Sequence, residues 1–296
     1  MKPLDPRSHI ALKSILLATD FSPASEAALP FALTVANHYG SMLYVAHVIS
    51  PEFMDLIPPD SAATMILAAK RSAQHDMEHL LKAASQRGVS CQALIGDGAI
   101  WDVLQDMIQQ NDLDLIVLGT HGRRGLRKFL LGSVAEEVFR KAPCPALMVG
   151  PQTLGIRSMD IHLEHILYPL EFVPDTSNAA AYAISFAEEY HARLTIMKVF
   201  EEEVPSTALK AAVQEPVIHW IDDHIPIDSD LRKRTSFEPG FGPAAEGILK
   251  FASDRGVDLI VMGARSLDPG MAAHFHQPDT AYEVVRTAPC PVLTVR

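Results

Sequence analysis

The segment Leu113–Val149, LDLIVLGTHGRRGLRKFLLGSVAEEVFRKAPCPALMV, decides the fold of this chain. It opens with a short apolar run, residues 113–118, that only Asp114 interrupts. A run of this length and composition predicts a strand that is buried on both faces. A basic loop punctuated by glycines follows, and helical spacing of apolar residues begins after Ser133. We therefore expect a strand, a basic loop and the N-terminus of a helix in direct succession.

The helix is predicted over residues 133–142. Ser133 is a favourable N-cap, and Glu136 three residues later completes a capping box. Pro143 closes the element. A helix N-terminus that follows a glycine-containing loop offers backbone N–H groups and a positive dipole to an anion. The alternative is a solvated loop in front of an ordinary capped helix.

The glycine spacing favours the first interpretation. Two residues separate Gly119 from Gly122, and nine residues separate Gly122 from Gly132-Ser133. This pattern, G-x2-G-x9-G-S between a buried strand and a helix, resembles the nucleotide-binding signature of the universal stress protein family. The chain has no Walker A motif, G-x4-G-K-[ST].

The resemblance implies an ATP site, with Mg²⁺ as the accompanying ion. Family positions at the ends of the first two strands contact the nucleoside, and the glycine loop and the following helix bind the phosphates. The matching residues here are Thr19, Asp20, Val48, Leu118, Gly119, Gly122, Arg123, Gly132, Ser133 and Val134. Without the glycine loop, a helix-capping role for Asp20 and an ordinary core position for Val48 would be the favoured interpretations.

Strands and helices alternate along the first half of the chain. Apolar runs predict strands at 13–20, 42–49, 89–95, 113–118 and 146–149. Between them, Ser22 and Pro23 begin a helix that Gly40 ends, and further helices are predicted over 58–86 and 99–110. This alternation predicts an α/β fold with a doubly wound, Rossmann-like parallel sheet, which we expect in the flavodoxin-type strand order.

The second half repeats this plan. DLDLIVLG (112–119) matches VDLIVMG (257–263), and RKAPCPALMV (140–149) matches RTAPCPVLTV (286–295). We therefore expect two tandem modules, residues 1–150 and 165–296, joined by a linker at 151–164. The family resemblance implies that the modules pair as a pseudo-dimer through their last strands, which would also cover two sheet edges. A homodimer of the whole chain is a further expectation.

The second glycine loop departs from the pattern. Gly263 is kept, but Ser266 replaces Gly122 and Pro278 replaces Gly132. Proline lacks the N–H that a phosphate would need. Asp279 places a carboxylate at the predicted helix N-terminus, and Leu170 and Glu171 replace the Thr-Asp pair of the first module. We expect the second module to be degenerate for ATP.

Composition narrows the class of protein. The 296 residues suffice for two domains, 48% are hydrophobic, and the net charge is −11. An acidic chain is a poor partner for nucleic acid. No apolar run is long enough for a membrane span, and the N-terminus lacks the apolar stretch of a secretory signal. Three cysteines without a C-x-x-C pair suggest reduced thiols, so we expect a cytoplasmic protein without membrane contact.

The sequence bears on two further chemistries, ATP hydrolysis and Zn²⁺ binding. Hydrolysis of ATP needs an oriented water as well as charge stabilisation, and no second carboxylate or glutamine is placed by the sequence to orient one. His121 in the loop is most simply a surface residue or a hydrogen-bond donor. In the second module, His274 and His276 with His219, Asp222, Asp223 and His224 are candidate Zn²⁺ ligands. Exposed polar side chains are the alternative for this second set.

Three candidate functions are consistent with the sequence. The first is a cytoplasmic stress-response regulator whose first module binds ATP, with the bound nucleotide shifting a conformational equilibrium. The second is a scaffold or interaction protein that binds no nucleotide. The third is a slow, Mg²⁺-dependent ATPase. A fold of this class hosts many chemistries, so it cannot separate the three.

Overall fold

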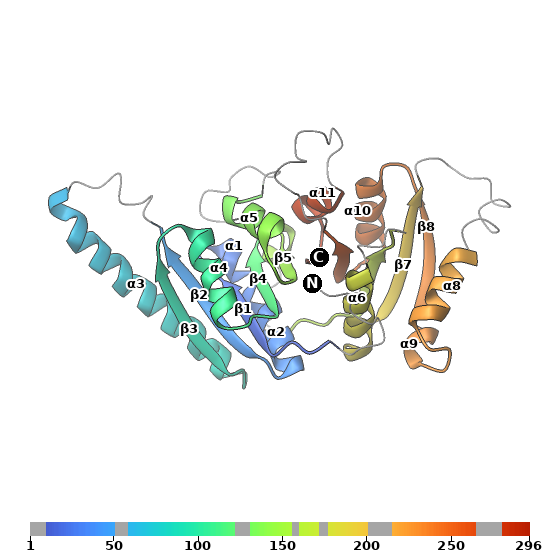
Figure 1. Ribbon diagram of the computed structural model, residues 1–296, viewed down its shortest axis with the longest axis horizontal. Coiled ribbons are helices and arrows are strands. Elements are labelled where there is room, and N and C mark those ends of the chain that lie inside the picture. The colour runs from blue at the N-terminus through green and yellow to red at the C-terminus, as the bar shows by residue number, and fades with distance from the viewer. Residues whose placement is uncertain are drawn as a thin grey trace. The chain divides into compact units, whose positions relative to one another are not determined.

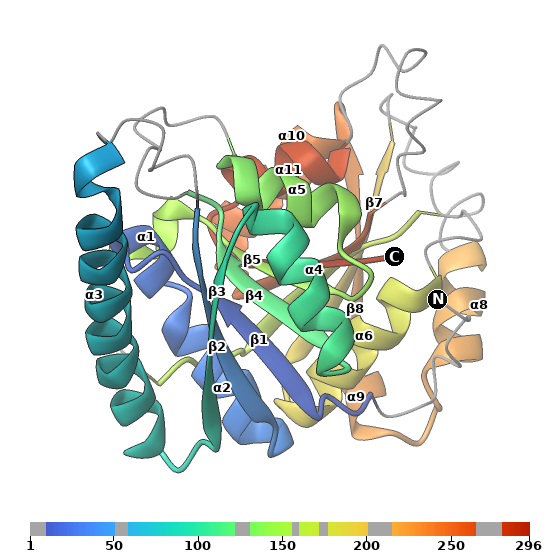
Figure 2. The same cartoon turned by 60° about the vertical axis from the view of Figure 1, so that its left-hand side comes forward.

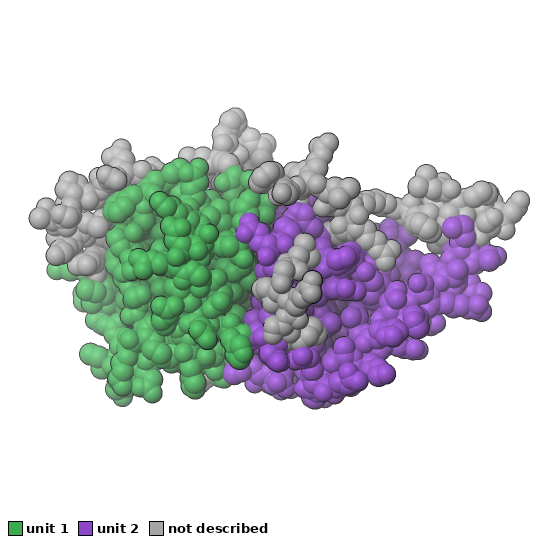
Figure 3. Space-filling model, turned by 180° about the vertical axis from the view of Figure 1, so that it is seen from behind, with its two compact units in different colours: residues 1–10, 162–296 green, residues 11–161 purple. Residues whose placement is uncertain are grey.

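The computed structural model describes residues 10–50, 59–121, 131–155, 160–171, 177–200, 215–264 and 280–296 (Figures 1 and 2). The chain divides into two compact units, one of residues 11–161 and the other of residues 1–10 with 162–296 (Figure 3). We call residues 11–161 (purple, unit 2 in the key of Figure 3) the first unit, and residues 1–10 with 162–296 (green, unit 1 in that key) the second unit. Each unit contains its own parallel sheet with helices on both faces.

The first unit has five parallel strands in the order β3-β2-β1-β4-β5. The strands are β1 (Ser14–Ala18), β2 (Met42–Ile49), β3 (Cys91–Asp97), β4 (Leu115–Gly119) and β5 (Ala146–Val149). The helices are α1 (Pro23–Glu26), α2 (Leu29–Tyr39), α3 (Pro59–Ser85), α4 (Ile100–Gln110) and α5 (Ser133–Lys141), with a short 3-10 helix, η2, at Pro151–Gly155. Helices α1, α2 and α3 cover one face of this sheet, and α4 and α5 cover the other (Figure 2).

The second unit repeats this order as β8-β7-β6-β9-β10. Its strands are β6 (His165–Pro169), β7 (Arg193–Phe200), β8 (Thr235–Phe241), β9 (Leu259–Gly263) and β10 (Val292–Val295). Its helices are α6 (Ser177–Glu189), α8 (Glu215–His224), α9 (Asp230–Lys233), α10 (Ala244–Arg255) and α11 (Thr280–Thr287). The identical strand order confirms the duplication that the sequence predicted.

The Rossmann-like fold class is confirmed, but the flavodoxin-type strand order was wrong. A flavodoxin-type sheet would place the third strand beside the first, on the side away from the second. Here β3 pairs with β2, and the chain crosses to the other side of β1 only with β4. The point where the strand order reverses therefore lies between β1 and β4.

The segment that predicted the fold forms the centre of the first unit. Leu115, Ile116 and Val117 of β4 are fully buried, because helices cover both faces of a doubly wound sheet. The continuous apolar run of β4 therefore forms a central strand, as predicted. Its counterpart β9 is buried in the same way.

An aspartate in front of each central strand ties it to the first strand of its unit. Asp114 Oδ2 accepts hydrogen bonds from the N–H groups of Lys13, at 2.7 Å, and Ser14, at 3.0 Å. In the second unit Asp258 Oδ2 accepts from Glu164 and His165, both at 2.9 Å. Asp114, the one polar residue in the apolar run, and its counterpart Asp258 therefore each tether two strands at the amino edge of their sheet.

The helix after the glycine loop begins differently from our prediction. Gly132, with φ −62° and ψ 151°, is the N-cap of α5, and Ser133 is already its first helical residue. The Gly132 carbonyl accepts the Glu136 N–H at 2.9 Å, so the backbone makes the first helical bond without a side-chain cap. The predicted capping box of Ser133 and Glu136 was therefore wrong.

Other boundaries moved by small amounts. The helix predicted after Ser22 is broken into α1 and α2, although Ser22 does cap α1 by accepting the Ser25 N–H. Gly40 ends α2 in the left-handed conformation, with φ 64°, which glycine adopts without strain. In the second unit the short helices α8 and α9 stand between β7 and β8, where the first unit has the long helix α3. Residues 201–214 lie outside the described part of the chain.

Candidate functional site

The predicted nucleotide residues that the structure describes gather at the carboxyl edge of the first sheet. Ala18 at the end of β1 is paired with Leu118 of β4, so Thr19 follows one strand where Gly119 ends its neighbour. This is the point of strand reversal, where sheets of this class bind ligands. Val48 lies near the end of β2, on the other side of β1, in register with Gly96.

Thr19 and Asp20 shape the turn that leads from β1 into α1. Thr19 is buried, and its hydroxyl accepts the Phe21 N–H and contacts the Ser25 hydroxyl, both at 3.0 Å. Asp20 Oδ1 accepts the Ser22 N–H at 3.0 Å. Phe21 takes φ 58°, an uncommon conformation for an aromatic residue. The bond between Asp20 and Ser22, just before α1, corresponds to the helix-capping alternative that the sequence left open for Asp20 beside nucleotide binding.

Gly119 allows β4 to approach α1 closely. A Cβ atom at this position would lie 2.5 Å from the Ala24 carbonyl oxygen and 3.0 Å from the Ala24 carbonyl carbon. Both are backbone atoms, so no side-chain rearrangement would relieve the clash. The first glycine of the motif is therefore required by the packing of the fold itself.

Gly132 closes the loop that begins after β4. Its N–H donates to the Thr120 carbonyl at 2.8 Å, and the Thr120 N–H donates to Val149 at 2.9 Å. The chain thus leaves and re-enters the sheet edge at one residue, Thr120, which is fully buried. Ser133 is exposed and Val134 half-buried at the start of α5. Gly122 and Arg123 lie outside the described residues.

His121 differs from the expected surface residue. It is only 7% exposed, and its Nδ1 lies 2.9 Å from the Thr120 hydroxyl. Its Nε2 is buried and, within the described part of the chain, has no hydrogen-bond partner. Burial lowers the pKa of His121 below the ordinary value, because the charged imidazolium loses its hydration.

His47 was also missed by the sequence reasoning. It lies on β2 in the middle of an apolar strand pattern, which gave no sign of a polar role. Its Nδ1 lies 2.8 Å from the Thr19 carbonyl, and its ring packs against Phe21 at a centroid distance of 4.5 Å. His47 thereby holds the turn after β1 from the neighbouring strand.

The corresponding edge of the second unit keeps the backbone and changes the side chains. The Leu170 N–H donates to the Met197 carbonyl at 2.7 Å, as Thr19 does to Ala46, and Ala264 donates to Val295, as Thr120 does to Val149. Leu170 is buried and apolar, so it cannot reproduce the hydroxyl contacts of Thr19. Ser266, Pro278 and Asp279 lie outside the described residues.

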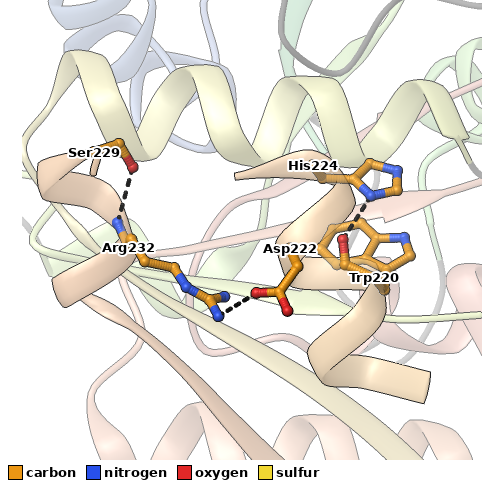
Figure 4. Close-up of polar contacts among 5 residues, drawn as sticks. All are labelled: Trp220, Asp222, His224, Ser229 and Arg232. Carbon is orange, nitrogen blue, oxygen red and sulfur yellow. Dashed lines mark hydrogen bonds and ion pairs between the residues drawn. The ribbon is translucent and has the colours of Figure 1, made fainter. Parts of the chain in front are cut away.

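The Zn²⁺ candidates of the second unit are engaged in other contacts (Figure 4). Asp222 pairs with Arg232 at 2.5 Å. His224 stacks on Trp220 at a centroid distance of 4.2 Å, and its Nδ1 lies 2.7 Å from the Trp220 carbonyl. Among the described residues, no group of three or more His, Cys, Asp or Glu side chains could hold a metal ion. Residues 219–224 do not form a three-ligand group by themselves. His274 and His276, the other members of the predicted set, lie outside the described residues.

A separate cavity of about 530 Å³ lies in the second unit. Its lining comes from the end of α6, from α9 and from Arg234, which precedes β8, so it is at the amino edge of the sheet. The lining carries both signs of charge, including the ion pair of Lys233 with Asp230 at 3.0 Å. This cavity is not at the edge where the predicted site lies.

Two of the cysteines are unsuited to nucleophilic chemistry. Burial raises the pKa of Cys144 and of Cys290 to about 12, so both remain protonated thiols near neutral pH. All three cysteines are free.

The strand order and the helices on both faces of each sheet define a duplicated, doubly wound α/β protein. The model of the universal stress protein family matches residues 11–150 and again residues 162–296. The chain therefore belongs to the universal stress protein family, with two such domains in tandem.

Individual relatives agree with this assignment. Universal stress protein Slr1230 of Synechocystis is 23% identical in an alignment of 312 positions that covers 96% of this chain and all of that protein. Universal stress protein MJ0531 of Methanocaldococcus jannaschii is 30% identical over 138 residues, 46% of this chain and 81% of that protein. The crystal structure of a universal stress protein from Archaeoglobus fulgidus superimposes with a TM-score of 0.74 at 19% identity, over 96% of this chain and 98% of that one. This last likeness concerns the fold.

In the described part of the chain, no helix has both the length and the apolar character of a membrane span.

Proposed function

We propose that the first unit binds ATP, with Mg²⁺, at the carboxyl edge of β1 and β4, and that the chain is a cytoplasmic stress-response regulator. The residues proposed for the nucleotide are Thr19, Asp20, Val48, Leu118, Gly119, Gly122, Arg123, Gly132, Ser133 and Val134. The second unit is proposed to bind no ATP and to serve as a structural or regulatory partner.

The observation that carries the proposal is the convergence of Thr19, Gly119 and Gly132 on the point of strand reversal. Thr19 and Gly119 end adjacent strands, and Gly132 is bonded to Thr120, the residue that follows Gly119. The N-cap of α5 is a glycine, so no N-cap side chain occupies the start of this helix, which suits a phosphate. At the same edge, the buried Nε2 of His121 has no hydrogen-bond partner among the described residues, which fits a polar ligand.

Gly132→Asp tests the site in the intact chain. The φ and ψ of Gly132 are open to any residue, and aspartate is a favourable N-cap, so the variant should fold. Its carboxylate would occupy the helix N-terminus and repel phosphate. We expect calorimetric titration with MgATP to show binding by the wild type and none by the variant.

Gly88→Asp is the matched control. It adds the same charge to the same unit in front of β3, at the amino edge of the sheet, where a Cβ atom meets nothing within 4 Å. Its φ of 77° is one that aspartate tolerates better than most residues. Binding that is equal in all three proteins would mean that the nucleotide is held at another site, and binding that is absent from the wild type would favour a scaffold without nucleotide.

A slow ATPase is the second candidate function. Within the described residues, Asp20 is the carboxylate at this edge that suits a metal ion, and its Oδ1 already accepts the Ser22 N–H. The proposal therefore favours binding over turnover. Phosphate release from MgATP by the wild type, lost in Gly132→Asp, would establish the ATPase instead.

We also propose that the two units pair through their last strands, residues 146–149 and 292–295, as the family resemblance implies. Taken by itself, each unit has this strand at one end of its order, and both strands are wholly apolar or nearly so. Unpaired edges of this kind favour association. Separately produced units should form a one-to-one complex on size-exclusion chromatography, and units that stay monomeric when mixed would refute the pairing.

A further inference from the structure

A pair of histidines stands on the exposed side of helix α3 and takes no part in the proposed nucleotide site. His75 and His79 are four residues apart, which places them on one face of the helix. Both side chains are exposed, whereas Ala73 and Met77, on the other side of the same turns, are buried. The helix therefore holds both imidazoles toward solvent in a fixed register.

The two rings are already close together. Their Nε2 atoms are 3.2 Å apart, and their centroids are 4.7 Å apart with an interplanar angle of 79°. In the described part of the chain, each imidazole has the other as its polar side-chain partner. Two nitrogens bound to one ion at 2.0–2.1 Å would lie about 2.9–3.4 Å apart for bond angles of roughly 90–110°. The observed separation is within that interval.

The geometry points to a binding site for a divalent transition-metal ion, of the Zn²⁺, Ni²⁺ or Cu²⁺ class, held by Nε2 of His75 and Nε2 of His79. Neutral imidazole suits these ions, whereas Mg²⁺ and Ca²⁺ prefer oxygen ligands. In the hydrogen-bonded pair one Nε2 carries a proton. An ion bound to both nitrogens replaces that proton, which moves to Nδ1 of the same ring.

The surrounding charges do not oppose a cation. Asp76 and Glu78 lie between the two histidines in sequence, and Arg71 and Lys82 lie one turn beyond the pair on either side. By helical spacing Asp76 neighbours His79 and Glu78 neighbours His75, as Arg71 and Lys82 also neighbour the pair, so charges of both signs surround it. Because the rings of His75 and His79 already lie at a ligating distance, a bound ion would require little movement of these side chains.

The site is one for binding and not for hydrolysis. His75, Glu78 and His79 read H-x-x-E-H, an order that also occurs in zinc peptidases. Catalytic zinc sites of that kind take three protein ligands, and the described residues supply no group of three. Water would complete the coordination of an ion held by two histidines.

The test is calorimetric titration of the untagged, full-length chain with ZnCl₂, and separately with CuCl₂ and MgCl₂. We expect one ion per chain, tighter binding of Cu²⁺ than of Zn²⁺, as the Irving–Williams order requires, and no Mg²⁺ at this site. Zn²⁺ should also raise the unfolding temperature, because the ion binds the folded helix in preference to the unfolded chain. His75→Ala and His79→Ala should each lose the site.

A rearranged variant separates a paired site from mere histidine content. Arg71→His together with His75→Arg keeps the composition and the charge, but sets the two histidines eight residues, ~12 Å, apart along the helix. This variant should lose Zn²⁺ binding, whereas His38→Ala, which removes an exposed histidine on α2, should keep it.

Two results would overturn the proposal. One is Zn²⁺ binding that survives His75→Ala and disappears in His274→Ala/His276→Ala, because the ion would then be held in the second unit. The other is weak uptake of several ions that falls equally with any histidine removed. Unchanged circular dichroism of each variant without metal would show that the helix is intact.

Discussion

At the scale of single residues, two histidines are buried where their charged form is disfavoured. His121 in the first unit and His165 in the second have lowered pKa values, in both cases mainly through burial, and Arg193 adds to the effect at His165. His165 is 4% exposed, with Nε2 2.8 Å from the Thr195 hydroxyl. Both imidazoles are therefore neutral in the folded protein near neutral pH.

A base whose pKa is lower in the folded state than in the unfolded chain makes stability depend on pH. The unfolded chain takes up the proton first, so the free energy of unfolding is largest above the ordinary pKa of 6.5 and falls below it. We expect His121→Gln to flatten this dependence in the first unit only, and His165→Gln in the second only. The unfolding temperature measured between pH 7.5 and pH 5 gives this pH dependence. A dependence as steep in both variants as in the wild type would contradict the burial argument.

Gly119 makes a prediction for stability as well as for binding. A methyl group there would meet the Ala24 carbonyl oxygen at 2.5 Å. Forced overpacking of this kind costs about 1–3 kcal/mol of unfolding free energy. Gly119→Ala should therefore destabilise the first unit by that amount in denaturant titrations and weaken MgATP binding. Wild-type stability in this variant would mean that β4 and α1 are not packed this closely.

At the scale of elements, the aspartate tethers explain why an apolar strand pattern contains one charged residue. Asp114 and Asp258 each bind two backbone N–H groups of the segment that starts the first strand. Hydrogen bonds to a charged acceptor contribute more than neutral ones. The two tethers therefore fix the start of β1 beside β4, and of β6 beside β9.

Asp114→Ala should lower the unfolding free energy of the first unit by about 1–3 kcal/mol, because two backbone donors lose their acceptor. Asp114→Asn keeps one oxygen and should cost less. Asp258→Ala is the internal comparison, with a loss of similar size in the second unit. Urea titrations of the three variants measure these differences, and an Asp114→Ala chain as stable as the wild type would refute the tether.

Most elements could be predicted from periodicity and punctuation, because Ser22-Pro23, Gly40 and Pro143 mark helix ends by local backbone physics. The N-cap of α5 could not, because Gly132 is held at the helix start by a bond to Thr120, a contact outside the helix. The strand order likewise depends on whether β3 pairs with β2 or with β1, and the residues of β3 alone do not determine which strand it pairs with. The burial of His121 was missed because a histidine after a strand is as often outside as inside.

At the scale of the whole molecule, the chain contains the same fold twice, and the two copies differ in the side chains at the carboxyl edge of the sheet. The strand order and the aspartate tether recur in both units. The buried hydroxyl at the carboxyl edge does not recur, since Leu170 replaces Thr19. Residues 1–150 carry 13 Lys/Arg and 15 Asp/Glu, and residues 151–296 carry 12 and 21, net charges of −2 and −9. The first unit is thus the less repulsive host for a polyanionic ligand.

The central claim is this asymmetry, and the stoichiometry of MgATP binding to the intact chain tests it most directly. Isothermal titration calorimetry should give one site per chain, absent in Gly132→Asp and retained in Gly88→Asp. Two sites per chain, or one site that survives Gly132→Asp, would contradict the account, because the nucleotide would then be held in the second unit.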